Sequence, residues 1–171
     1  MKKIFETERL LVRELQEEDW LKVFEMNTSI EVMRQIGEGK IKTAEEEQSS
    51  FKSILANYQK GTGLGVWAVV RKGDNTFIGA ASMAPLADTN EIQLGYRLKK
   101  QYWKQGYGTE IAKGLVDYGF NYLNLDKVTA TTNLDNDASR RVLQKAGLSF
   151  EKKDVYNNWP MNYFVIHKKK E

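Results

Sequence analysis

The sequence predicts an α/β fold, because segments with strand-like and helix-like apolar periodicity follow one another along its 171 residues. Three strand-like segments separated by short turns lie near the middle and predict an antiparallel meander. Helix-like segments stand on both sides of this meander. The length is that of one ordinary domain, so we expect a single domain over residues 1–171.

The first half of the chain begins with a short apolar run between charges at residues 8–14, which predicts a strand. Acidic residues at 17–19 then open a helix, where the helix dipole favours negative charge. A second helix is expected to begin at Thr43, because Glu46 stands three residues later as in a capping box. Its apolar face comprises Phe51, Ile54, Leu55 and Tyr58.

The meander and the second half follow from the same periodicities and turn signals. We expect meander strands at 66–71, 77–84 and 91–98, the first two joined by a tight turn at 73–75 and the last two by a looser connection at 85–90. After them we expect a helix at 108–123, a strand at 127–132, a short helix at 136–146 and a hairpin at about 150–156 and 162–168.

The composition excludes several function classes. Without any cysteine, the chain has no disulfide, no zinc-thiolate site and no cysteine nucleophile. The single histidine, His167, is interpreted as part of a solvated tail, which argues against a Ser-His-Asp triad and a multi-histidine metal site, so no metal is expected. No apolar stretch is long enough for a membrane span or signal peptide, which predicts a cytoplasmic protein without membrane partners. The net charge of +3 does not indicate nucleic-acid binding.

The most informative segment is residues 91–110. Its first part alternates, with Ile92 and Leu94 facing one way and Glu91 and Gln93 the other, as in a strand. The run 106–108 (Gly-Tyr-Gly) then opens an amphipathic helix, and its backbone N–H groups can approach an anion at the helix N-terminus. Glycines at such a place also serve simply as a turn, and this alternative stays open. The Walker A and dinucleotide-binding patterns are absent.

Residues 103–110 (Trp-Lys-Gln-Gly-Tyr-Gly-Thr-Glu) resemble the acetyl-coenzyme A pyrophosphate loop of the GNAT superfamily, Arg/Gln-x-x-Gly-x-Gly/Ala. An aromatic residue at the first position, here Trp103, is similar to its RimJ/RimL-like branch of ribosomal-protein N-terminal acetyltransferases. Residues 7–13 and 94–98 are similar to the same branch. Residues 133–148 resemble the family segment Asn-x-x-Asn-x-x-Ser followed by Lys-x-Gly-Phe. Together these stretches span most of the chain.

The resemblance implies a GNAT fold, a mixed and mostly antiparallel sheet splayed in the middle with helices on both faces. It places acetyl-CoA, the expected cosubstrate, in the splay. The pantetheine part of the coenzyme would pair with the backbone of residues 96–98. The alternative is that this backbone forms an ordinary hydrogen-bond ladder with a neighbouring strand. Asn133 and Asn136 would contact the coenzyme or serve as helix caps. The implied coenzyme-binding residues are Tyr96, Arg97, Leu98, Trp103, Lys104, Gln105, Gly106, Tyr107, Gly108, Thr109, Asn133 and Asn136.

The resemblance also suggests catalytic residues. Ser139 would protonate the departing thiolate, an alternative being an ordinary polar residue near a helix start. Family members often have a glutamate where this chain has Gln93, so the base is less defined. Glu91 is the candidate, acting through a water, and its alternative is a solvated strand end. Glu151 and Asp154 are doubtful candidates in the last hairpin.

The predicted function is an N-acetyltransferase that moves acetyl directly from acetyl-CoA to a primary amine. The acceptor is a protein N-terminus or a small molecule such as a polyamine, and it would lie between the first two helices and the last hairpin. A chain without an obvious base favours an amine of low pKa. The alternative is a non-catalytic acyl-CoA-binding sensor or accessory protein, which the glutamine at 93 favours. A homodimer is left open.

Overall fold

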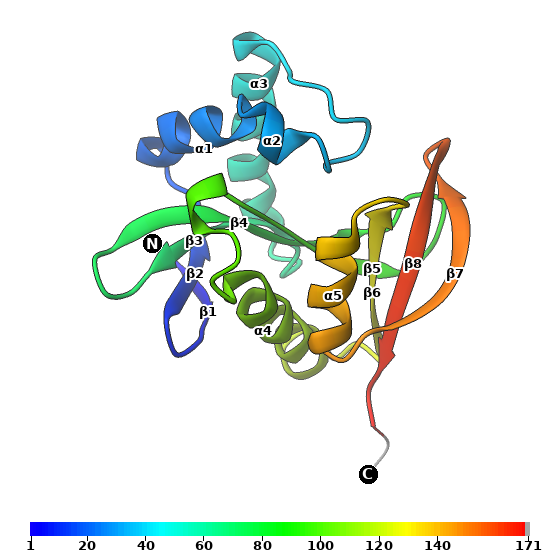
Figure 1. Ribbon diagram of the computed structural model, residues 1–171. Coiled ribbons are helices and arrows are strands. Elements are labelled where there is room, and N and C mark those ends of the chain that lie inside the picture. Colours follow the sequence, from blue (N-terminus) through cyan, green and yellow to red (C-terminus); the bar gives the residue numbers. More distant parts are fainter. Residues whose placement is uncertain (170–171) are drawn as a thin grey trace.

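The computed structural model describes residues 1–169 and contains an eight-stranded sheet in the order β1-β2-β3-β4-β5-β6-β8-β7 (Figure 1). Neighbouring strands are antiparallel except β5 and β6, which are parallel. The expected α/β class and the mixed, mostly antiparallel sheet are therefore confirmed. The strands are β1 (Lys3–Glu6), β2 (Leu10–Glu14), β3 (Gly65–Arg71), β4 (Thr76–Pro85), β5 (Ile92–Leu98), β6 (Lys127–Asn133), β7 (Ser149–Tyr156) and β8 (Trp159–His167).

Helices cover both faces of the sheet. The helices are α1 (Trp20–Asn27), α2 (Ile30–Met33), α3 (Ala44–Asn57), α4 (Tyr107–Asn121) and α5 (Asp137–Lys145). Figure 1 shows α1, α2 and α3 grouped on one side of the sheet and α4 and α5 on the other. Alternate residues of β3 explain this division, because successive side chains of a strand point to opposite faces. Trp67 and Val69 belong to the core beneath α4, whereas Ala68 and Val70 belong to the core beneath α1 and α3.

Two expected segments differ from the structure. The strand expected at 8–14 is β2, which begins at Leu10. It pairs with an additional strand, β1, across a turn in which the Thr7 N–H donates to the Leu10 carbonyl. The last hairpin has a two-residue turn, Asn157 and Asn158, instead of a loop. Both asparagines have positive φ (49° and 61°), which a tight hairpin turn of this twist requires and asparagine tolerates. His167 is accordingly not part of a tail: it ends β8, pairs with Lys127 and is exposed.

The sheet opens between β5 and β6. β5 pairs with β4 along its whole length, from Ile92 with Pro85 to Leu98 with Gly79. Its register with β6 is the single pair Gln93 and Thr129. Beyond this pair the two strands separate, so the second half of β5 has a ladder partner on one side only. The sheet is therefore splayed near its middle, as the family resemblance implies.

The connection between β4 and β5 joins the two halves of the sheet. Leu86 is buried against Tyr156 and Tyr163 of the last hairpin. The side chain of Asp88 accepts a hydrogen bond of 2.9 Å from the N–H of Asn157 at the hairpin turn. This segment, expected as a loose connection, is thus packed across the splay.

A buried ion pair fixes where α1 leaves the sheet. Arg13 at the end of β2 donates to both carboxylate oxygens of Asp19, at 2.6 and 3.0 Å, and the Gln16 N–H donates to the same carboxylate. Asp19 is 2% exposed. Burial opposes its ionisation, but the hydrogen bonds from Arg13 and Gln16 outweigh it and hold the pKa of Asp19 below its usual range.

We expect Asp19→Ala to lower the free energy of unfolding by about 3–5 kcal/mol at pH 7, because it leaves the buried Arg13 without a carboxylate partner. Since the folded-state pKa of Asp19 is depressed, this contribution is complete above the unfolded-state pKa of about 4 and is lost as pH falls through the folded-state value. Urea unfolding of wild type and variant at pH 7 and at about pH 2.5 measures it. Glu18→Ala is the control, because Glu18 is an exposed acid next to Asp19. It should change the free energy of unfolding by less than about 0.5 kcal/mol. A loss equal at both pH values would contradict the expectation.

Candidate active site

The loop before α4 meets the open side of β5. After β5 the chain forms a 3-10 helix, Lys100–Tyr102, and α4 begins at Tyr107. Lys104 and Gly106 have positive φ, 59° and 81°, so the loop has a left-handed backbone at two positions within three residues. The indole N–H of Trp103 donates to the Leu98 carbonyl at 2.9 Å and holds the loop against the end of β5. The first N–H groups of a helix have no acceptor within the helix, so this end of α4 favours an anion.

The loop needs glycine at positions 106 and 108 for two different structural reasons. Gly106, the N-cap of α4, has a left-handed backbone that a residue with a Cβ rarely adopts. Gly108 has an ordinary helical backbone, but a Cβ there would lie 3.2 Å from the ring of Tyr96 and 3.5 Å from Val142. Gly108 therefore allows the Tyr96 ring to pack against the start of α4.

Two hydroxyl groups meet between β5 and α5. The hydroxyl of Tyr96 lies 3.3 Å from Oγ of Ser139. Burial raises the pKa of Tyr96, and the hydrogen bond with Ser139 opposes this effect. Tyr96 is therefore a neutral O–H group at physiological pH, and the pair can donate or pass on a proton.

Asn136 and Ser139, at the start of α5, have different contacts. The side chain of Asn136 accepts from the N–H of Ser139 at 3.1 Å, so Asn136 is the N-cap. The hydroxyl of Ser139 is not part of this cap and contacts Tyr96 instead. Any contact of Asn136 with a coenzyme would use its Nδ2 group, because its Oδ1 atom is engaged in the cap.

The side chain of Asn133, at the end of β6, is hydrogen-bonded to two other segments. Its Nδ2 donates to the Gly37 carbonyl at 3.2 Å, and its Oδ1 accepts from the indole N–H of Trp159 at 3.2 Å. A cavity of about 290 Å³ lies beside it, between the segment after α2 and the last hairpin. The last hairpin lines it, but the first two expected helices do not, so the expected acceptor position stays a prediction. The lining of the cavity includes Arg34, Glu38, Leu134, Asp135 and Trp159.

The structure does not bring Glu91 together with Ser139. Glu91 forms an ion pair with Lys127 and accepts a hydrogen bond of 2.7 Å from the hydroxyl of Tyr163. Burial opposes its ionisation, but Lys127 and Tyr163 outweigh it and lower the pKa of Glu91. Its carboxylate is ionised at neutral pH but has a low proton affinity. It lies on the opposite strand face from Tyr96 and roughly 16 Å along the strand from it, at about 3.3 Å per residue.

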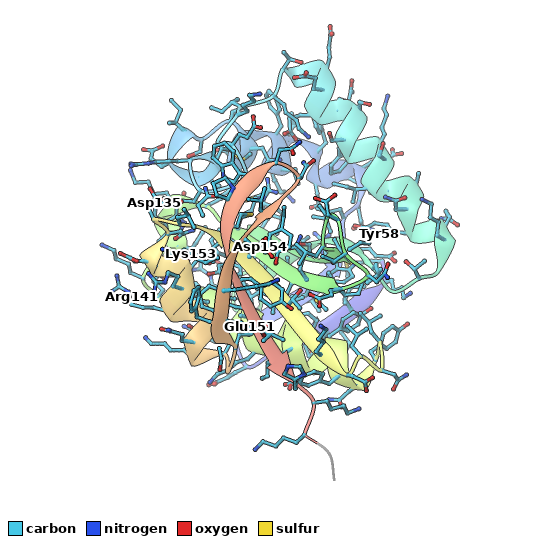
Figure 2. All side chains as sticks on the ribbon, turned by 90° about the vertical axis from the view of Figure 1, so that its right-hand side faces the viewer. Tyr58, Asp135, Arg141, Glu151, Lys153 and Asp154 are labelled. Atoms are coloured by element: carbon cyan, nitrogen blue, oxygen red, sulfur yellow. The ribbon has the colours of Figure 1, made fainter. Side chains whose placement is uncertain are left out.

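The face that carries Glu91 has a second cavity, of about 350 Å³. Glu151 and Asp154 line it from β7, and Figure 2 shows both along that strand. Asp154 is paired with Lys152 at 2.7 Å. Between the two cavities, at the point where the strands diverge, Gln93 accepts a hydrogen bond of 2.9 Å from Thr131.

The side chain of Arg97 points away from α4. It donates to Asn27 of α1 at 3.0 Å, and Asn27 in turn donates to the buried Glu47 of α3 at 3.0 Å. The side chain of Arg97 is therefore not available for the coenzyme role that the sequence implied. No local sequence pattern indicates this buried polar network, because its members come from three separate elements.

Within residues 1–169, no three His, Asp or Glu side chains gather as a metal ion would require. No helix in this part of the chain is long and apolar enough to cross a membrane.

Comparison with known proteins gives the same architecture. YoaA of Bacillus subtilis, named as an uncharacterized N-acetyltransferase, is 30% identical over 157 residues, which are 91% of this chain and 87% of that protein. The crystal structure of a GNAT-family acetyltransferase from Bacillus anthracis superposes with a TM-score of 0.80 at 25% identity, covering 95% of this chain and 96% of that one.

RimL, a ribosomal L7/L12 α-N-protein acetyltransferase solved in complex with coenzyme A, has a TM-score of 0.80 at 15% identity and covers 97% of this chain and 98% of its own. At this identity the likeness shows a shared fold. Residues 9–149, from the turn before β2 into β7, match the acetyltransferase (GNAT) domain family. Since these residues include both the splayed strands and the loop that faces them, the chain belongs to the GNAT family of acetyltransferases.

Proposed function

We propose that this acetyltransferase moves an acetyl group directly from acetyl-CoA to a primary amine, either a protein N-terminus or a small molecule. The observation that carries the proposal is the separation of β5 from β6 beside the start of α4. It leaves strand backbone and helix N–H groups facing one opening. An amide-containing chain ending in a pyrophosphate, as in coenzyme A, matches both kinds of group.

The coenzyme would lie along the second half of β5. Its pantetheine amides would pair with the backbone of residues 96–98, as an added strand does at a sheet edge. Its pyrophosphate would bind to the N–H groups of residues 103–109, with Asn133 and Asn136 as further polar contacts. The solved complex of RimL with coenzyme A supports this donor by analogy of fold.

The proposed reaction is direct, and the absence of a cysteine that could carry the acetyl group fits this route. The lone pair of the amine attacks the thioester carbonyl carbon, a C–N bond forms and the C–S bond breaks. The leaving thiolate takes a proton, which we assign to the hydroxyl of Ser139. Tyr96 lies in contact with that hydroxyl and can return a proton to it.

Acetyl-CoA is expected to raise the melting temperature, because a ligand that binds only the folded state stabilises it by mass action. At about 100 times the dissociation constant the gain is about 2.7 kcal/mol, or roughly 5–10 °C for a chain of this size. Gly106→Val should abolish most of the shift. Gly61→Val is the matched control, since Gly61 also has a left-handed backbone (φ 63°) with no atom near its Cβ position. Unchanged melting of the wild type at millimolar acetyl-CoA would contradict the proposed donor.

Ser139→Ala is expected to lower kcat by roughly ten- to ten-thousand-fold with little change in coenzyme affinity. It should also leave stability nearly intact, because the cap uses the backbone N–H of residue 139. Asn136→Ala is the companion variant and should cost about 1 kcal/mol of stability through loss of the N-cap. Turnover at saturating substrates and thermal unfolding measure the two effects. A fully active Ser139→Ala enzyme would remove Ser139 from the proton transfer.

We assign removal of the amine proton to Glu91, which would act through a chain of waters because it lies roughly 16 Å along the strand from Tyr96. Because its pKa is lowered, Glu91→Gln is expected to reduce kcat by about tenfold, below the roughly hundred- to ten-thousand-fold of a well-matched base. The loss should be greater for a lysine ε-amine, with a pKa near 10.4, than for an α-amine near 8. Rates measured with both acceptors between pH 6 and 10 test this. Equal rates in wild type and variant would leave Glu91 as the ion-pair partner of Lys127 alone.

A second candidate function is an acyl-CoA-binding sensor without catalysis. It is favoured by Gln93, an amide at the strand divergence that cannot accept a proton, and by the pairing of Glu91 with Lys127. A panel of amines, including N-terminal peptides of ribosomal proteins, separates the two functions. Thiol release with any amine supports the transferase, and a coenzyme-dependent melting shift without thiol release supports the sensor.

A further inference from the structure

The turn between β1 and β2 holds the first turn of α4 through one carboxylate. Glu110 accepts a hydrogen bond of 2.5 Å from the hydroxyl of Thr7. The same carboxylate accepts from the backbone N–H of Arg9 at 2.9 Å and from Nε of Arg9 at 2.7 Å. Residues 101 positions apart in the sequence are thereby joined beside the pyrophosphate loop.

The guanidinium of Arg9 also contacts the loop itself. Its Nη1 donates to the carbonyl of Gln105 at 3.0 Å, and its Cζ lies 4.3 Å from the centre of the Tyr107 ring. In a trans peptide the carbonyl and the following N–H point in opposite directions. Because Arg9 takes the carbonyl of Gln105, the N–H of Gly106 is directed away from Arg9.

The charge of Glu110 would oppose a bound phosphate. Burial resists the ionisation of Glu110, but the hydrogen bonds of Thr7 and Arg9 outweigh it and keep its pKa below the usual range. Its negative charge therefore stands in the first turn of α4 at neutral pH, where the helix attracts anions. A neighbouring carboxylate repels a phosphate, and a paired cation cancels most of that repulsion.

We propose that Arg9 is a positioning residue for the coenzyme loop, which orients the Gln105–Gly106 peptide and neutralises Glu110 so that the pyrophosphate can bind. The inference rests on the proposed function, because it requires that this loop binds the phosphates of acetyl-CoA. It assigns Arg9 no direct part in the acetyl transfer.

The test compares the affinities of two ligands, acetyl-CoA and the phosphate-free acetyl-pantetheine, by calorimetric titration. Arg9→Ala should raise the Kd of acetyl-CoA by about ten- to a hundredfold, the range for a lost charged hydrogen bond. It should leave the Kd of acetyl-pantetheine unchanged. Lys72→Ala is the matched control: Lys72 donates to the Thr7 carbonyl of the same turn at 2.8 Å, contacts neither Glu110 nor Gln105, and has a side chain 41% exposed against 42% for Arg9.

A double variant separates the charge effect from a loss of structure. Removing the carboxylate as well, in Arg9→Ala/Glu110→Gln, should recover part of the lost affinity, because no unpaired negative charge then remains beside the loop. Arg9→Lys should be intermediate, since it keeps the charge without the planar fork. Three outcomes would each overturn the inference. Arg9→Ala and Lys72→Ala could bind acetyl-CoA with equal affinity, or Arg9→Ala could lose equal affinity for acetyl-CoA and acetyl-pantetheine. The third is a double variant that binds acetyl-CoA more weakly than Arg9→Ala. A wild type that fails to bind acetyl-CoA would instead refute the proposed function.

Discussion

The structure depends on a parallel strand pair that lasts for one residue position, Gln93 and Thr129. Parallel neighbours need a crossover connection, and here α4 supplies it. α4 packs in one core with Leu94 of β5 and with Val128 and Ala130 of β6, so it holds both half-sheets while they diverge. Main-chain groups rarely stay unpaired in a protein interior. The divergence therefore defines one place in the fold where an elongated polar ligand can take the position of a missing strand.

The same divergence separates two chemical environments. The α4 face holds the neutral Tyr96 and Ser139 hydroxyls. The other face carries the Gln93–Thr131 contact and charges that are paired, such as Glu91 with Lys127. The hydroxyls suit proton donation to a leaving thiolate, whereas the paired carboxylate of Glu91, roughly 16 Å along the strand, can act at the same reacting carbon only through water.

The features that the sequence could predict are local ones. The cap at Thr43, the cap at Asn136 and the meander are set by residues within a few positions of each other. The family resemblance added the splay, which no periodicity indicated. The contacts of Arg9 with Glu110 and of Asn133 with Gly37 join positions about a hundred apart, and depend on how finished elements pack. The different reasons for Gly106 and Gly108 also needed coordinates, because only the position of the Tyr96 ring distinguishes them.

The segment from Leu86 to Asp88 has a mechanical consequence for the splay. Because Leu86 is buried in the last hairpin and Asp88 is bonded to its turn, the two half-sheets are braced on the side opposite α4. The two half-sheets are thus packed together on the α4 face and on the opposite face, so they cannot move apart without exposing apolar surface. The opening is therefore shaped during folding rather than by its occupant, so a ligand entering it faces little reorganisation cost. By the same reasoning, the bracing segment is where a change in sequence would turn a rigid cleft into a flexible one.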